Sequence, residues 1–164
     1  MRIKGIGRSK AQRMVALAEL TRRMFLHRKE TAPMMDKPEV VTEFLRPYVT
    51  GLTVEKFWVL CRNRRNRLIK LVELTSGLAD TTLVHPREVF RAAIREGGCC
   101  QIVVGHNHPS GDPSPSSNDF TITRTLRAAA TTIGIGLLDH VVVGTSEADP
   151  TRKGYFSFRE AGVV

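Results

Sequence analysis

Short apolar runs and longer amphipathic segments alternate along this chain. Residues 55–60 predict a strand in which Phe57 and Val59 face one side, and Trp58 and Leu60 face the other. Further apolar runs bounded by turn residues predict strands over residues 68–74, 102–105, 136–143 and 155–158. Apolar residues repeated every three or four positions predict helices over residues 39–46, 86–96 and 117–133, and a basic helix near the N-terminus.

Turn and capping residues delimit the predicted helices. Pro47 and Gly51 are expected to end the first helix after the basic one. His85 is expected to cap the next helix, which Pro86 opens, or to pack beside it, rather than to bind metal. Gly134 is expected to stop the helix over residues 117–133. Strands that alternate with helices predict a mixed α/β fold, an α+β mixed sheet flanked by helices. The apolar positions of the helix after His85 are Val89, Phe90, Ala93 and Ile94.

Charge is unevenly distributed along the chain. Its net charge is +9, yet residues 1–30 alone hold nine Lys and Arg against two Glu, and residues 61–70 hold five bases and no acid. We therefore divide the chain into a basic helical segment, residues 1–30, and a main domain, residues 31–164. Clustered bases attract polyanions, so nucleic acid is a candidate partner of the first segment.

The start of the chain resembles part of a DNA-binding element. Ile3-Lys4-Gly5-Ile6-Gly7, followed by Ser9-Lys10-Ala11, is similar to the hairpin and second helix of a helix-hairpin-helix motif. In that motif, backbone N–H groups at a helix N-terminus contact a DNA phosphate. The first helix of the motif is absent, so the segment is interpreted as a remnant. A structural turn before a helix capped by Gly7 or Ser9 is at least as good an interpretation.

The sequence also predicts a compartment. No stretch approaches the ~20 apolar residues of a membrane-spanning helix, and the N-terminus lacks the apolar core of a signal peptide. The three cysteines include no C-x-x-C pair and are interpreted as small buried residues. We therefore expect a cytoplasmic protein with no membrane contact.

The stretch from His106 to Asp119 carries the candidate chemistry. His106 and His108 follow the predicted strand 102–105, and side chains two apart on a strand point the same way. After a loop rich in Pro, Gly and Ser, Asp119 lies in the first turn of the next helix. Two imidazoles and a carboxylate are the three protein ligands of a catalytic zinc site, whose fourth position is left for water. The alternative is that Ser116-x-x-Asp119 is only a helix-capping box.

His106-x-His108-Pro109, followed by six residues, Ser116, two residues and Asp119, resembles the JAMM (MPN+) metalloprotease motif. Residues 84–88, 105–113 and 137–141 are similar to its bacterial RadC branch, and the resemblance extends from about residue 5 to about residue 162. It implies the JAMM/MPN architecture, which is related to that of cytidine deaminases. It also implies a Zn²⁺ ion held by His106, His108 and Asp119, and a peptide or protein substrate cleaved at a peptide or isopeptide bond.

Zinc-assisted hydrolysis needs a general base that is not a metal ligand. In JAMM proteins this acid comes from upstream, and Glu55 is the position that matches. Glu88 is the second candidate, although an acid in the first turn of a helix is already favoured by the helix dipole. The family's serine matches Ser116, and the resemblance implies that it hydrogen-bonds the water or the tetrahedral intermediate; capping the next helix is its alternative role.

Asp139 and His140 are adjacent on the predicted strand 136–143 and therefore face opposite sides of the sheet. Both cannot line one metal site from regular strand geometry. We interpret them as structural residues, with a hydrogen-bonding role behind the metal ligands as the less favoured alternative.

Two functions from different classes follow. The first is a JAMM-type zinc metallopeptidase. The second is a DNA-associated repair or replication accessory module with a structural or vestigial metal site. The intact ligand set with a candidate base favours the enzyme. No H-E-x-x-H helix is present, and the P-C-x-x-C sequence of nucleobase deaminases is missing, so those zinc chemistries fit less well.

Overall fold

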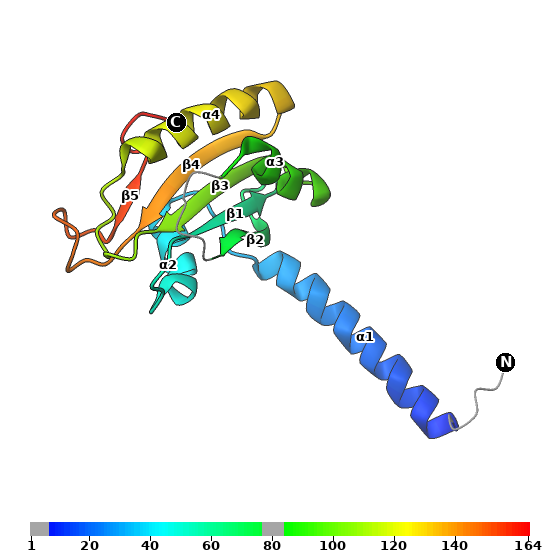
Figure 1. Ribbon diagram of the computed structural model, residues 1–164. Helices are drawn as coiled ribbons and strands as arrows, with labels where there is room; N and C mark the ends of the chain where they lie inside the picture. Colours follow the sequence, from blue (N-terminus) through cyan, green and yellow to red (C-terminus); the bar gives the residue numbers. More distant parts are fainter. Residues whose placement is uncertain (1–6, 77–83) are drawn as a thin grey trace. The chain divides into compact units, whose positions relative to one another are not determined.

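The computed structural model describes residues 7–76 and 84–164, and the chain forms two compact units, Met1–Ala32 and Pro33–Val164 (Figure 1). The first unit consists of the predicted basic helix, α1, over Arg8–Thr31. Gly7 precedes it as the N-cap, and no side chain caps it. Ser9 lies inside the helix, so it is not the cap. The remainder of the predicted hairpin, residues 3–6, lies outside the described residues.

In the described residues 33–76 and 84–164, the second unit has a five-stranded sheet and three helices, which confirms the mixed α/β prediction. The strand order is β2-β1-β3-β4-β5; β3 and β4 are parallel, and every other neighbouring pair is antiparallel. Helix α4 connects the parallel pair, as a parallel connection requires. In chain order the elements are α2 (Pro38–Val49), β1 (Lys56–Arg62), β2 (Leu68–Ser76), α3 (Pro86–Arg95), β3 (Gln101–Asn107), α4 (Ser117–Ile133), β4 (Gly136–Val143) and β5 (Tyr155–Ser157).

Both faces of the sheet are covered, α3 and α4 lying over one face and α2 over the other (Figure 1). The alternation predicted for β1 assigns its residues to these faces: Phe57 and Val59 pack in the core under α3 and α4, and Trp58 and Leu60 pack in the core under α2. The central strand β3 is buried on both faces. Packing on both faces therefore fixes the C-terminal end of β3, where the candidate ligands lie.

One predicted helix end is wrong in part. Helix α2 ends at Val49, before Gly51, but it continues through Pro47, because a proline in the last turn costs only one hydrogen bond while Val49 packs against the core under α2. Of the apolar positions of α3, Ile94 is 64 % exposed, because it lies about 100° around the helix from the fully buried Ala93. Among residues 7–76 and 84–164, no helix is long and apolar enough to span a membrane.

Candidate metal centre

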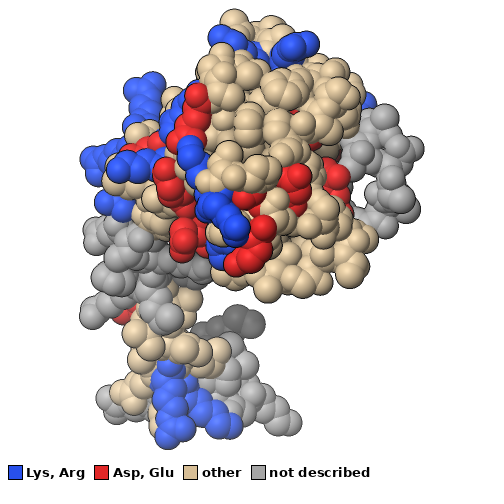
Figure 2. Space-filling model, turned by 90° about the vertical axis from the view of Figure 1, so that its left-hand side faces the viewer, with Lys and Arg blue, Asp and Glu red and all other residues tan. Residues whose placement is uncertain are grey.

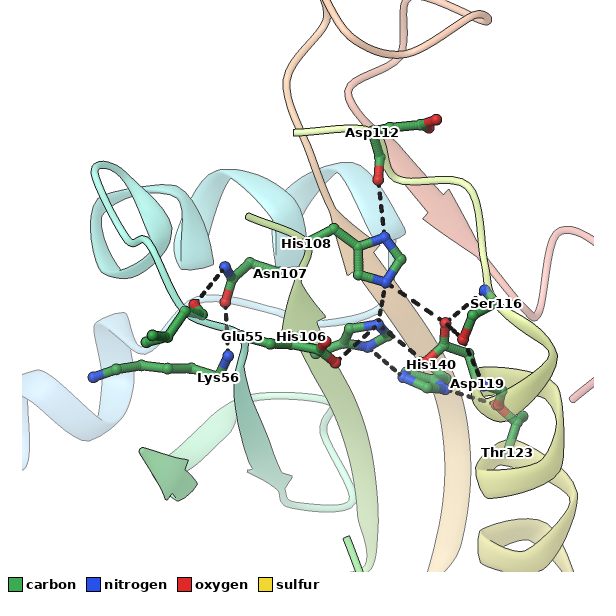
Figure 3. Close-up of polar contacts among 11 residues, drawn as sticks. Glu55, Lys56, His106, Asn107, His108, Asp112, Ser116, Asp119, Thr123 and His140 are labelled. Atoms are coloured by element: carbon green, nitrogen blue, oxygen red, sulfur yellow. Dashed lines mark hydrogen bonds and ion pairs between the residues drawn. The ribbon is translucent and has the colours of Figure 1, made fainter. Parts of the chain in front are cut away.

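Three elements and one loop bring the candidate residues together (Figure 3). His106 is near the end of β3, His108 follows that strand, and Asp119 lies in the first turn of α4. Glu55 immediately precedes β1, whose Phe57 pairs with His106. One ligand atom from each of Glu55, His106, His108 and Asp119 lies within 4.8 Å of the others, so this group could hold a metal ion.

The two imidazoles and Asp119 form the tight part of the group. The Nε2 atoms of His106 and His108 are 3.1 Å apart. Asp119 Oδ1 lies 3.2 Å from the Nε2 of His106, and Asp119 Oδ2 lies 3.6 Å from the Nε2 of His108. Glu55 Oε1 is further away, at 3.9 Å from His106 Nε2. The side chains of His106 and Asp119 are almost completely buried, whereas those of His108 and Glu55 are 17 % and 28 % exposed and give the group its access to solvent.

A hydrogen-bond chain that ends on a backbone carbonyl determines the tautomer of His106. Thr123 must donate its hydroxyl proton to the carbonyl oxygen of Asp119, 2.6 Å away, because a carbonyl only accepts. The Thr123 oxygen therefore accepts from Nδ1 of His140 at 2.6 Å. Burial holds the pKa of His140 well below its ordinary value, so this ring is neutral and its Nε2 accepts from His106 Nδ1 at 2.9 Å. His106 is thus left with an unprotonated Nε2 that faces the other ligand atoms.

The tautomer of His108 follows from a similar contact. Its Nδ1 donates to the backbone carbonyl of Asp112 at 2.9 Å, which leaves a lone pair on Nε2. Two nitrogen lone pairs 3.1 Å apart repel each other unless a cation lies between them. When His108 is protonated, its Nε2–H donates to the Asp119 carboxylate, and this bond raises the pKa of His108. The cluster therefore attracts positive charge, and two imidazole nitrogens with a carboxylate are a donor set that fits a metal ion.

The Asp119 carboxylate is itself held in place by Ser116. Ser116 donates from both its backbone N–H and its hydroxyl to Asp119 Oδ2, each at 2.7 Å, and its oxygen accepts from the backbone N–H of Asp119. Burial raises the pKa of Asp119, but the hydrogen bonds that the His106 and His108 imidazoles donate to it when they are protonated outweigh that effect and hold this pKa well below its usual range. Ser116 thus forms the capping box of α4, and its part in binding a reaction intermediate stays a prediction.

The remaining sequence candidates lie outside this group. Glu88 is on α3, where its carboxylate pairs with Arg87 and Arg91. His85 caps α3 as predicted, its Nδ1 accepting from the backbone N–H of Arg87. Asp139 points to the opposite side of β4 from His140 and accepts from the Ser157 hydroxyl at 2.7 Å.

His140 makes the hydrogen bond behind the metal ligands that was the less favoured alternative: it contacts His106 directly and stacks on Phe158, with ring centroids 4.7 Å apart. Thr123 was not among the candidates from the sequence. Thr123 follows Asp119 by one turn of α4, and a polar residue on the buried face of an amphipathic helix is the signal that could have found it.

The contact between Thr123 and His140 has a measurable consequence. We expect Thr123→Val, which removes the hydroxyl but keeps the shape, to weaken metal binding by about 10- to 100-fold, because His140 loses the partner that sets its orientation. The measurement is the dissociation constant for zinc, obtained by competition with a chelating dye. Thr125→Val is the matched control, since Thr125 makes the same kind of bond to the helix backbone on the exposed side of α4. Equal zinc affinity in both variants would refute the role of the hydrogen bond between Thr123 and His140.

Comparison with known proteins agrees with this geometry. The family model described as the RadC-like JAB domain matches residues 35–163. The chain belongs to the RadC-like JAB domain family. Membership confirms the resemblance drawn from the His106–Asp119 motif, and a JAB domain with a group able to hold a metal ion fits a metallohydrolase.

Two relatives show how much of a longer protein this chain covers. A UPF0758 protein of Chlorobium phaeovibrioides is 41 % identical over 156 residues, which are 95 % of this chain and 66 % of the relative. A UPF0758 protein of Caldanaerobacter subterraneus is 40 % identical over 157 residues, 95 % of this chain and 67 % of the relative. The chain thus spans about two thirds of the length of these two relatives, and their names state no activity.

Proposed function

We propose that this protein is a zinc-dependent metallopeptidase that hydrolyses a peptide or isopeptide bond in a peptide or protein substrate. One observation carries the proposal: two imidazole lone pairs and the Asp119 carboxylate converge, and the Glu55 carboxylate stands at their open side, 3.9 Å from His106 Nε2. Three protein ligands with nitrogen and oxygen donors are typical of catalytic zinc. When bound, zinc polarises a carbonyl and lowers the pKa of water.

Glu55 is the proposed general base. It is half-buried and solvent-accessible, and it lies too far from His106 Nε2 for a direct hydrogen bond, so its oxygens are available to a water molecule. In this role Glu55 takes a proton from the attacking water and delivers it to the leaving amine. Glu88 is less suitable, because its carboxylate is occupied by two arginines on α3.

For Ser116 we propose the oxyanion-type role implied by the JAMM resemblance. Its hydroxyl has one proton, which is donated to Asp119 Oδ2 at 2.7 Å in the structure. To hydrogen-bond a developing oxyanion, the hydroxyl must rotate away from Asp119. The hydroxyl therefore cannot fill both roles at once. It donates to Asp119 until the oxygen of a substrate carbonyl competes for the same proton.

The direct test is cleavage of a peptide library and of isopeptide-linked peptides, read by mass spectrometry. We expect cleavage by the zinc-loaded protein, its loss after treatment with a chelator, and its return on adding zinc. Cleavage that survives both metal removal and the Glu55→Gln substitution would come from a contaminant and would count against the proposal.

Charge distribution favours a second candidate, DNA association through the first unit. Nine of the 25 Lys and Arg lie in the first 32 residues, against two of the 16 acids. The second unit is nearly neutral by comparison, and basic and acidic side chains are interspersed on its face in Figure 2. Arg62, which the sequence placed in a second basic cluster, is fully buried. Any DNA contact is therefore expected from residues 1–30.

This second candidate makes its own prediction. If residues 1–30 bind duplex DNA, affinity should fall about 10³-fold between 50 and 200 mM salt and vanish when these residues are removed. Fluorescence anisotropy with a labelled duplex measures both effects. Replacing the exposed Arg64 and Arg65 by Gln is the control and should change little. Binding that is absent, or indifferent to salt, rules the candidate out.

A further inference from the structure

The segment that carries Glu55 has little packing of its own to hold it in place. Val54 is 38 % exposed and the Glu55 side chain is 28 % exposed, while Phe57 is the first buried residue of the segment. Strand β1 begins only at Lys56. The position of the Glu55 carboxylate beside the histidines therefore depends on whatever fixes the backbone on either side of it.

Asn107 supplies this support from the end of β3 (Figure 3). Its Oδ1 accepts from the backbone N–H of Lys56 at 3.0 Å, and its Nδ2 donates to the backbone carbonyl of Val54 at 3.1 Å. The two bonds engage both peptide groups attached to the Cα atom of Glu55. Asn107 is 3 % exposed, so its amide is shielded from water while it makes these contacts.

We propose that Asn107 is a positioning residue, whose side-chain amide holds the two peptide groups flanking Glu55 and thereby aims the Glu55 carboxylate at the candidate metal centre. This inference rests on the proposed function, which makes Glu55 the base. Phe57 pairs with His106, and continuing this antiparallel register sets Lys56 opposite Asn107. The Asn107 side chain thus extends the contact between β1 and β3 by one residue beyond their last paired residues.

The chemistry of the position favours an amide of this length. The backbone carbonyl of Val54 can only accept a hydrogen bond, and the backbone N–H of Lys56 can only donate one. A side chain that binds both must therefore donate to the first and accept from the second. Aspartate would accept from Lys56 but would set a carboxylate oxygen against the Val54 carbonyl. Alanine would do neither. Because Asn107 lies between His106 and His108, the same strand end positions both the ligands and the base.

Carbon-13 NMR of protein labelled at the glutamate carboxyl carbons tests the inference without any substrate, with Glu55→Gln identifying the Glu55 resonance. In the wild type, we expect one equivalent of zinc to shift this resonance. In Asn107→Ala, the zinc dissociation constant should change less than threefold, while the Glu55 shift should fall by at least half. An undiminished shift in Asn107→Ala would overturn the inference.

Kinetics supply a second test, because substitution of a residue with only a structural role would not lower kcat through Glu55. We expect Asn107→Ala to lower kcat by about 10- to 100-fold with little change in KM, the size of effect that a displacement of about 1 Å produces. In the Glu55→Gln background, Asn107→Ala should cost less than twofold, because its effect acts through Glu55. Equal losses in both backgrounds would show that Asn107 acts through the metal ligands or through stability.

The control variant is Asn63→Ala, which also removes a side-chain oxygen that accepts from two backbone N–H groups, those of Arg65 and Arg67, but in the turn between β1 and β2. It should leave the Glu55 resonance and kcat near wild type. If Asn107→Ala does not fold, Asn107→Asp keeps the shape and the bond from the Lys56 N–H, and it should show the same changes because the bond to the Val54 carbonyl is lost.

Amide hydrogen exchange separates failure of this inference from failure of the proposed function. A wild type that binds no zinc would refute the metallopeptidase proposal. The exchange rate of the Lys56 amide would still test whether Asn107 holds the peptide groups that flank Glu55. We expect this rate to rise at least tenfold in Asn107→Ala. An unchanged exchange rate would overturn the positioning role, with or without metal.

Discussion

Replacing Asp119 with Ala should abolish tight zinc binding. Among the described residues, Asp119 is the carboxylate that contacts both candidate imidazoles, at 3.2 and 3.6 Å. Its removal leaves two facing nitrogen lone pairs with Glu55 as the remaining carboxylate of the group, 3.9 Å from His106 Nε2. The loss should exceed the 10- to 100-fold effect typical of an outer hydrogen-bond partner. Zinc per chain, measured by mass spectrometry after dialysis, should be about one for the wild type and near zero for Asp119→Ala and His106→Ala.

Asp112→Ala is the matched control for this experiment. Asp112 lies in the same loop, but it contacts His108 through its backbone carbonyl, which the substitution keeps. The variant should therefore retain zinc. A wild type without zinc, even after refolding with the metal, would contradict the metal centre and make DNA association the leading function. Zinc retained in Asp119→Ala would show that the ion binds elsewhere.

Replacing Glu55 with Gln should leave zinc bound and lower kcat by about 10²- to 10⁴-fold, the range in which a general base contributes. Glutamine has the same shape but cannot accept a proton at neutral pH. Measuring kcat and KM on a peptide found in the cleavage screen, together with zinc content, separates loss of the base from loss of the metal. KM should change little.

Glu88→Gln is the natural comparison, because the sequence made Glu88 the second candidate for the base. It lies on α3 in an ion pair with Arg91, so its substitution should leave kcat within about twofold of wild type. A larger loss in Glu88→Gln than in Glu55→Gln would reverse the assignment. Loss of zinc in Glu55→Gln would make Glu55 a ligand.

Local sequence signals predicted most elements of the fold. Helix α4 spans Ser117–Ile133 as expected, and Gly134 ends it in the left-handed conformation that glycine adopts readily. Strand β4 spans Gly136–Val143, the predicted range. These signals worked because caps and apolar runs act on residues a few positions apart. Pro47 misled for the opposite reason, since burial of Val49 against a distant part of the chain outweighed a local helix-ending preference.

The sequence by itself determined the family, the mixed fold and the three closely spaced candidate ligands, because His106, His108 and Asp119 meet through one strand end, one loop and one helix start. Only the tertiary structure decided which acid accompanies them. Glu55 reaches the histidines through the pairing of β1 with β3, and His140 reaches His106 across 34 residues of chain. The hydrogen bond between Asn107 and the Lys56 amide joins residues that are 51 positions apart in the sequence. Such contacts depend on sheet register and on the packing of α4, which no local pattern encodes.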